Sequence, residues 1–92
     1  MTSFSIVITD KLGIHARPAA LIVKEAGLFK DTKITFAKGE KAVDGKRLFA
    51  VMGLGVKCGE ELKVTAEGPS EEEAAAKIKH LIEDNLCNYH IY

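Results

Sequence analysis

The stretch Leu12-Gly13-Ile14-His15-Ala16-Arg17-Pro18-Ala19-Ala20 connects a short segment of alternating apolar residues to a longer segment with helical apolar spacing. Gly13 indicates a turn, and Pro18 is tolerated in the first turn of a helix, where an N–H group would have no partner. The stretch therefore predicts a strand that turns into a helix, with His15 at or beside the N-cap of that helix.

The predicted helix start brings an imidazole close to unpaired backbone N–H groups. These groups, on Ala16 and Arg17, point away from the helix, and the helix dipole favours negative charge at this end. Such an end can hold a phosphoryl group. His15 would be the nucleophile, and the N–H groups and the Arg17 guanidinium would receive the phosphoryl oxygens.

The alternative is that His15 is a surface residue without chemistry, which is the commoner role of a histidine at an N-cap. The use of arginine favours the phosphoryl hypothesis. The chain has two arginines, Arg17 and Arg47, against eleven lysines. Arginine is the side chain suited to bidentate contact with phosphate, and Arg17 lies two residues from His15.

Length and composition limit the possible classes of protein. The 92 residues predict a single domain, residues 1–92, with enough buried surface for one core but not for a deep pocket. The hydrophobic content of 47% and the charged content of 28% are ordinary for a globular protein. We therefore expect any chemistry to take place on the surface.

The two cysteines, Cys58 and Cys87, lie far apart and have no metal-ligand spacing, so no metal site is expected. A disulfide is left open, although reduced thiols are the better expectation. The first five residues lack the basic and apolar blocks of a signal peptide, and no apolar stretch is long enough to enter and span a membrane. These features predict a cytoplasmic protein without membrane insertion.

Charge is unevenly distributed although the net charge is zero. Residues 1–57 carry ten basic and five acidic side chains, a net of +5, and residues 58–92 carry three basic and eight acidic ones, a net of −5. The positive part contains His15, which suits a phosphate group or an acidic partner surface. It is too poor in arginine and interleaved aromatic residues to indicate nucleic-acid binding.

Apolar periodicity predicts seven elements. The expected strands are Phe4–Thr9, Thr32–Ala37, Glu40–Val43 and Glu60–Glu67, and the expected helices are Ala16 to about Leu28, Lys46–Met52 and Ser70 to about Leu86. Since each strand has one apolar face, the fold class is α+β, an open-faced β-sandwich of order β-α-β-β-α-β-α. The four-stranded sheet is expected to be antiparallel, with the helices on one face.

Local signals add three details to this prediction. Lys38-Gly39 is expected to form the hairpin turn between the second and third strands. Ser70 and Glu73 have the spacing of a capping box at the start of the last helix. Residues 85–92 are expected to form a C-terminal tail. His80 and His90 are expected to be solvated surface residues.

The run Gly13–Ala19 resembles the active-site motif of the histidine-containing phosphocarrier (HPr) family of the bacterial phosphoenolpyruvate-dependent sugar phosphotransferase system. A second match is Val43–Gly55, and a third is Gly68 with the acidic helix start that follows it. The resemblance covers the chain from about Phe4 to Glu83. It implies the fold class given above and a phosphocarrier, not a stand-alone turnover enzyme, that works as a monomer and needs no cofactor.

The resemblance also implies the site and its partners. The Nδ1 atom of His15 would accept a phosphoryl group from phosphorylated enzyme I and pass it to IIA domains of sugar permeases, assisted by Arg17. The only carboxylate close to His15 in sequence is Asp10, so no base for attack by water is expected.

The implied docking surface lies on and beside the second helix. Its residues are Ala20, Arg47, Leu48, Phe49 and Met52. The alternative for Leu48 and Phe49 is plain core packing. Adjacent residues of a short helix cannot all face inward, so part of this apolar set is expected to be exposed.

Arg47 is a departure from part of the family. Many relatives from Gram-positive bacteria have a serine there that a regulatory kinase phosphorylates. No serine or threonine lies between Thr35 and Thr65. The sequence therefore predicts that this regulatory serine is absent.

Two other classes of function were weighed against the phosphocarrier. One is an HPr-like regulatory module whose partner binding depends on the phosphorylation state of His15. The other is a small α+β hydrolase such as an acylphosphatase, which needs a water-orienting asparagine beside an anion-binding loop. Asn85 and Asn88 lie in the C-terminal helix and tail, which argues against the hydrolase.

Overall fold

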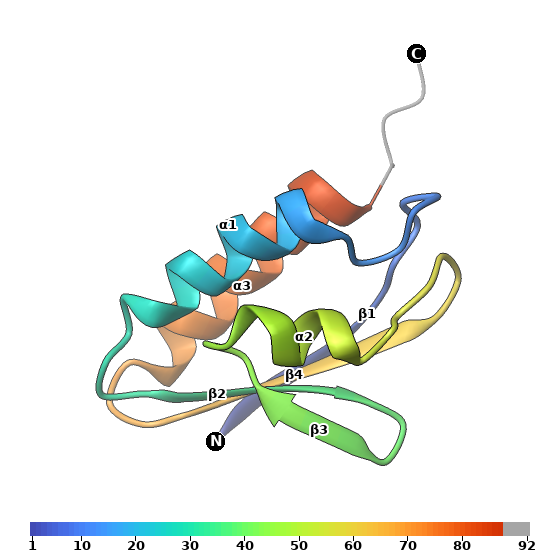
Figure 1. The fold of residues 1–92 in the computed structure, drawn as a ribbon. Helices are drawn as coiled ribbons and strands as arrows, with labels where there is room; N and C mark the ends of the chain where they lie inside the picture. The colour runs from blue at the N-terminus through green and yellow to red at the C-terminus, as the bar shows by residue number, and fades with distance from the viewer. Residues whose placement is uncertain (88–92) are drawn as a thin grey trace.

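A computed structural model describes residues 1–87 and is shown in Figure 1. The elements in chain order are β1 (Thr2–Val7), α1 (Ala16–Gly27), β2 (Lys33–Lys38), β3 (Lys41–Asp44), α2 (Leu48–Gly53), β4 (Glu61–Glu67) and α3 (Glu71–Leu86). The predicted order β-α-β-β-α-β-α is confirmed. No helix among these residues is long and apolar enough to cross a membrane.

The four strands form one antiparallel sheet in the order β1-β4-β2-β3. Strand β4 lies inside the sheet, where its Val64 is opposite Phe4 of β1 on one side and Phe36 of β2 on the other. The three helices lie on one face of this sheet and leave the other face open (Figure 1). The predicted open-faced α+β sandwich is therefore confirmed.

Strand periodicity decides which side chains enter the core. In β4, Leu62, Val64 and Ala66 are buried, whereas the alternate residues face away from the helices. The helices supply the other half of the core with residues at helical spacing. These buried helical residues are Ala19, Ile22 and Ala26 of α1, Val51 of α2, and Ala74, Ala75, Ile78, Ile82 and Leu86 of α3.

Several predicted boundaries differ from the structure by one or two residues, and each of the four strands is affected. The first strand, expected at Phe4–Thr9, spans Thr2–Val7, because the N–H of Thr9 bonds to the Leu86 carbonyl and not to a strand. The hairpin turns at Gly39 and Glu40, one residue later than expected, because Lys38 still pairs with Lys41 and Gly39 supplies the positive φ of 59°. Helix α2 begins at Leu48, not at Lys46. Its start is fixed by Asp44, whose Oδ1 accepts the Lys46 N–H at 2.9 Å in a turn that precedes the helix.

The predicted capping box at the start of α3 is wrong. Ser70 is the N-cap residue, but its backbone lies at φ −108° and ψ 26°, outside the extended conformation of a capping residue, and its side chain makes no cap hydrogen bond. Its own N–H donates to Oγ1 of Thr32 at 3.1 Å. Glu71, and not Glu73, accepts a backbone N–H, that of Gly68 at 3.2 Å.

Glu71 also holds the start of β1 against this turn. Its Oε2 atom lies 2.7 Å from the Met1 ammonium and accepts the Thr2 hydroxyl at 2.8 Å. The ammonium, the Thr2 hydroxyl and the Gly68 N–H together lower the pKa of Glu71 to about 2.

The predicted C-terminal tail, residues 85–92, begins too early. Asn85 and Leu86 belong to α3, and Cys87, next in sequence, is 1% exposed. The helix continues because Leu86 is an apolar core residue at helical spacing from Ile82. His90 and the remainder of the predicted tail lie outside the described residues. Cys58 is exposed and its thiol donates to the Thr9 carbonyl at 3.6 Å, whereas Cys87 is buried and its thiol donates to the Val7 carbonyl at 3.4 Å.

The loop between β1 and α1 is held at both of its flanks by backbone hydrogen bonds. The Leu86 carbonyl accepts the N–H groups of Thr9 at 3.1 Å and Asp10 at 2.9 Å, and the Val56 carbonyl accepts that of Ile14 at 2.9 Å. Between these anchors, Gly13 has a φ of 66°. A Cβ atom at Gly13 would lie 2.4 Å from the Val56 oxygen. Only glycine fits this crossing of two backbones.

We predict that Gly13→Ala lowers the free energy of unfolding by roughly 2–4 kcal/mol, since the side chain meets both an unfavourable φ and a backbone oxygen. Gly55→Ala is the matched control. Gly55 has a φ of 64° but open space around its Cβ position, so a cost of about 1 kcal/mol is expected. Urea unfolding of the two variants measures the difference. Equal costs would show that the close approach to Val56 is unimportant.

Candidate phosphoryl-transfer site

His15 is the N-cap residue of α1, as the sequence predicts. Its backbone is extended, with φ −124° and ψ 173°, and its side chain caps no N–H group. The His15 carbonyl accepts the N–H of Ala19 at 3.0 Å, which is the first i to i−4 hydrogen bond of the helix. The imidazole therefore stands at the positive end of α1 and is free for other contacts.

The first turn of α1 presents two backbone donors. The N–H groups of Ala16 and Arg17 precede the first bond of the helix and have no acceptor within α1. Pro18, the next residue, has no N–H group. Its ring is buried, which fixes the direction of this turn. The N-terminus of α1 thus presents two unpaired donors at the positive end of the helix dipole.

Asp10 contacts the imidazole from the side of the loop. Its Oδ2 atom lies 3.6 Å from Nε2 of His15, while its Oδ1 atom accepts the N–H of Leu12 at 2.8 Å. The side chains of His15 and Asp10 are 32% and 20% exposed. The acidic residue near His15 in sequence is therefore also near it in space, but beside Nε2. Nδ1, the other ring nitrogen, is not engaged by Asp10.

An open groove of about 450 Å³ lies beside the imidazole. It is lined by Asp10, His15, Arg17, Pro18, Ala20, Leu21, Lys24 and Asn85. The structure thus brings the predicted residues His15, Arg17 and Ala20 together, but the groove contains no residue of α2.

Three groove residues were not found by sequence reasoning. Leu21 and Lys24 could have been, because they lie one helical turn beyond Arg17 and Ala20 on the same face. Asn85 comes from the end of α3, where its Nδ2 donates to the Leu81 carbonyl at 2.8 Å. Nothing local in the sequence indicates that α3 ends at this groove.

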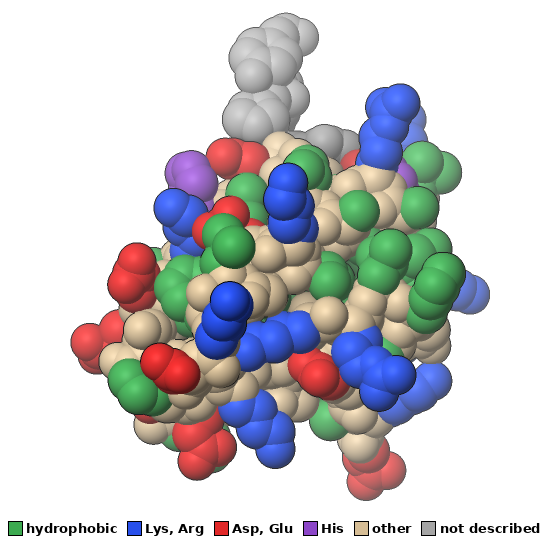
Figure 2. Space-filling model, turned by 60° about the vertical axis from the view of Figure 1, so that its left-hand side comes forward, with side chains coloured by type: hydrophobic (Ala, Val, Ile, Leu, Met, Phe, Trp, Pro, Cys, Tyr) green, Lys and Arg blue, Asp and Glu red, His purple; other side chains and the backbone are tan. Residues whose placement is uncertain are grey.

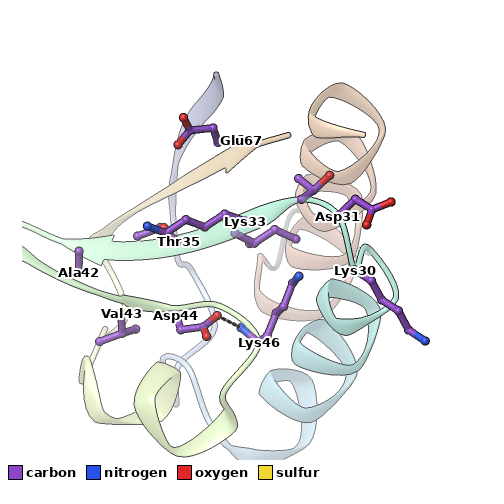
Figure 3. Close-up of a pocket in the computed structure, with 11 residues that line it drawn as sticks. Lys30, Asp31, Lys33, Thr35, Ala42, Val43, Asp44, Lys46 and Glu67 are labelled. Atoms are coloured by element: carbon purple, nitrogen blue, oxygen red, sulfur yellow. Dashed lines mark hydrogen bonds between the residues drawn. The ribbon is translucent and has the colours of Figure 1, made fainter. Parts of the chain in front are cut away.

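A larger depression of about 680 Å³ lies away from His15, between β2, β3 and the loops that flank them (Figure 3). Its lysines, Lys30, Lys33 and Lys46, alternate with the carboxylates of Asp31, Asp44 and Glu67. Lys46 is already used, because its Nζ donates to the Phe29 carbonyl at 2.7 Å. The balanced charges and this structural bond distinguish the depression from the positively charged end of α1.

The sequence also predicts that His80 is a surface residue and that the chain has no metal site. His80 is exposed, and its Nε2 lies 3.2 Å from Oδ2 of Asp84 one turn later. Within residues 1–87 no group of three or more His, Cys, Asp or Glu side chains could hold a metal ion.

Comparison with known proteins identifies the family. A family model described as "PTS HPr component phosphorylation site" matches residues 2–84. The chain belongs to the HPr family. The phosphocarrier protein HPr of Mycoplasma capricolum is 39% identical over 84 residues, which are 91% of this chain and 93% of that protein. The function of the present chain is that of the family, a phosphocarrier of the phosphotransferase system.

Solved HPr structures share the fold over nearly the whole chain. The crystal structure of HPr-C-His from Thermoanaerobacter tengcongensis has a TM-score of 0.87 and 40% identity, and covers 99% of this chain and 100% of that one. A crystal structure of an HPr dimer from the same organism has a TM-score of 0.72 and 43% identity, with coverages of 91% and 95%.

The residues that the resemblance assigns to docking in this HPr-family protein differ in exposure. Phe49 is 85% exposed, and Arg47 and Ala20 are also exposed, whereas Leu48 and Met52 are partly buried. Figure 2 shows one face of the molecule, on which Lys and Arg side chains cross the middle and hydrophobic side chains gather at the right. Core packing, the alternative for Phe49, is therefore excluded.

We predict that Phe49→Glu changes the free energy of unfolding by less than about 0.5 kcal/mol, because the ring is already in water. Val51→Ala is the comparison on the same helix. Val51 is 1% exposed, so its truncation is expected to cost about 2 kcal/mol. Thermal and urea unfolding measure both variants. Loss of cooperative unfolding in Phe49→Glu would contradict the assigned exposure.

Proposed function

We propose that Nδ1 of His15 accepts a phosphoryl group from phosphorylated enzyme I and donates it to IIA domains of sugar permeases. The observation that carries this proposal is the position of His15 at the N-cap of α1, beside the unpaired N–H groups of Ala16 and Arg17. The Nδ1 lone pair forms a bond to phosphorus while the bond between phosphorus and the donor breaks. The proton on Nε2 stays in place. The second transfer reverses these events toward the acceptor.

The end of α1 stabilises the charge of the transferred group. The two N–H groups donate to phosphoryl oxygens, and the helix dipole adds about half a positive charge at this end. Arg17 is exposed and lines the same groove as His15, so its guanidinium can reach an oxygen with two parallel N–H groups. This combination of fixed donors and one mobile cation supports Arg17 as the assisting residue.

The same donors support transfer over hydrolysis. Neither a backbone N–H nor a guanidinium can take a proton from an attacking water. The one carboxylate that lines the groove, Asp10, lies beside Nε2 and not beside Nδ1. With its side chain 32% exposed, His15 can be reached by two large partners in turn. We therefore propose a carrier that is restored at each second transfer, not a turnover enzyme.

Both partners would dock on the face formed by α1 and α2. Phe49 provides an exposed apolar contact, Arg47 and Ala20 are also exposed, and Leu48 and Met52 are partly buried. An exposed aromatic residue next to arginine is the usual composition of a binding hot spot. One docking face that serves two partners in succession supports a monomer as the working form, and membership of the phosphotransferase-system family supports a cytoplasmic location.

Arg47 gives this docking face a different chemistry from that of relatives with a regulatory serine. It is the N-cap of α2, it is exposed, and it carries no hydroxyl group. We propose that phosphorylation at this position plays no part in regulation. The positive charge instead adds to the attraction of an acidic partner surface.

We expect His15→Ala to abolish the gain of one phosphoryl group when the protein is mixed with enzyme I and phosphoenolpyruvate, since within residues 1–87 no other histidine lies at the free N–H groups of a helix start. Intact-mass spectrometry measures the gain. His80→Ala is the matched control, because His80 is exposed and also lies beside an aspartate. It should gain one group as the unaltered protein does. Phosphorylation of the His15→Ala variant at His80 or His90 would overturn the proposal.

Replacement of Arg17 by lysine tests the role of the guanidinium. Arg17→Lys keeps the charge but loses the planar pair of donors, so we expect phosphoryl transfer from enzyme I to slow by roughly tenfold. The free energy of unfolding should change by less than about 0.5 kcal/mol, because the side chain is exposed. Rapid-quench kinetics measures the rate. Transfer at the unaltered rate would show that charge alone is sufficient.

A further inference from the structure

Three hydrogen bonds hold Asp10 in the loop between β1 and α1. Its backbone N–H donates to the Leu86 carbonyl at 2.9 Å, and its own carbonyl accepts the Gly13 N–H at 2.9 Å. Its Oδ1 atom accepts the N–H of Leu12 at 2.8 Å. These three bonds fix both the backbone and the plane of the carboxyl group. The remaining oxygen, Oδ2, is the atom that faces Nε2 of His15 at 3.6 Å.

No other side chain that lines the groove carries a negative charge. The other charged side chains that line it, Arg17 and Lys24, are cations and accept no hydrogen bond. Asn85 has its Nδ2 donor engaged by the Leu81 carbonyl. The negative charge that acts on the imidazole in this groove therefore comes from Asp10.

We propose that Asp10 is a positioning residue for His15, which keeps the ring proton on Nε2 and so leaves the Nδ1 lone pair free to attack phosphorus. This inference rests on the phosphoryl transfer proposed above. A neutral imidazole has one N–H group, and its location is set by the partner of the other nitrogen. A carboxylate beside Nε2 attracts the proton to that atom.

The proton on Nε2 has consequences for both transfers. When Nδ1 forms the bond to phosphorus, the ring keeps its Nε2 proton and gains positive charge, which the Asp10 carboxylate offsets. When the bond to phosphorus breaks, its electron pair returns to Nδ1, and the leaving group is a neutral imidazole and not an imidazolate anion. The carboxylate stabilises the charged ring without taking its proton, as the aspartate of a Ser-His-Asp triad does.

Asp10→Asn tests this role without disturbing the loop. The asparagine Oδ1 can still accept the Leu12 N–H, so its Nδ2 amide takes the place of Oδ2. An amide donor beside Nε2 favours a lone pair on that nitrogen and moves the ring proton to Nδ1. The substitution therefore reverses the polarity of the contact while it keeps the turn.

The first measurement is the tautomer of His15, from the 15N shifts of its ring nitrogens above about pH 8, where histidine is ordinarily neutral. We expect the unaltered protein to hold the proton mainly on Nε2, and Asp10→Asn to raise the Nδ1–H fraction at least twofold. Asp84→Asn, in the exposed His80–Asp84 pair, is the matched control. It should alter the ring nitrogens of His80 and leave those of His15 unchanged.

The second measurement is the rate of phosphoryl gain from enzyme I, with thermal unfolding as a check on the fold. We expect Asp10→Asn to slow transfer at least fivefold with an unchanged unfolding temperature, and Asp84→Asn to transfer normally. An unchanged His15 tautomer in Asp10→Asn overturns the proposal, as does a shifted tautomer with an unchanged rate. The tautomer is measured without enzyme I. If the unaltered protein gains no phosphoryl group, the proposed function fails whatever the tautomer result.

Discussion

The carbonyl of Leu86, at the end of α3, accepts the N–H groups of both Thr9 and Asp10, and the geometry of the site depends on this contact. It fixes the loop after β1 against the last turn of a helix from the far end of the chain. The bond from Ile14 to the Val56 carbonyl then fixes the other side of the loop. His15 follows these anchors directly, so its backbone is placed by hydrogen bonds to two distant segments, and its ring then lies beside Asp10.

The site separates opposite charges on the two sides of one ring. The positive end of α1 and the Arg17 guanidinium lie on the side of the helix, whereas the Asp10 carboxylate lies beside Nε2. In the proposed transfer, the first set would bind the phosphoryl oxygens and the second would stabilise the protonated ring. Arg17 is exposed and Asp10 is partly exposed, which suits a site that two partners must reach in turn. The surface position of the site thus follows from its chemistry as well as from the small size of the fold.

Local pattern was sufficient for the parts of the fold that periodicity controls. The alternation in β4 and the position of Pro18 in the first turn of α1 predicted the sheet face and the N-cap at His15 correctly. The failures concern contacts between distant segments. The capping box at Ser70 was wrong because Thr32, from another part of the chain, accepts the Ser70 N–H. Asn85 was missed as a groove residue because no local signal shows that α3 ends beside His15.

Pro18 limits the number of backbone hydrogen bonds that the N-terminus of α1 can donate to a phosphoryl group. The phosphoryl group that we propose on Nδ1 would have three terminal oxygens, but the proline ring leaves the N-terminus of α1 with two backbone donors, on Ala16 and Arg17. The first turn of α1 therefore offers fewer backbone donors than a phosphoryl group has terminal oxygens. Each partner can supply a further donor from its own surface, so that donors of both proteins would bind the phosphoryl oxygens during transfer. In the proposed transfer, the phosphoryl group would therefore leave without the loss of a third backbone hydrogen bond.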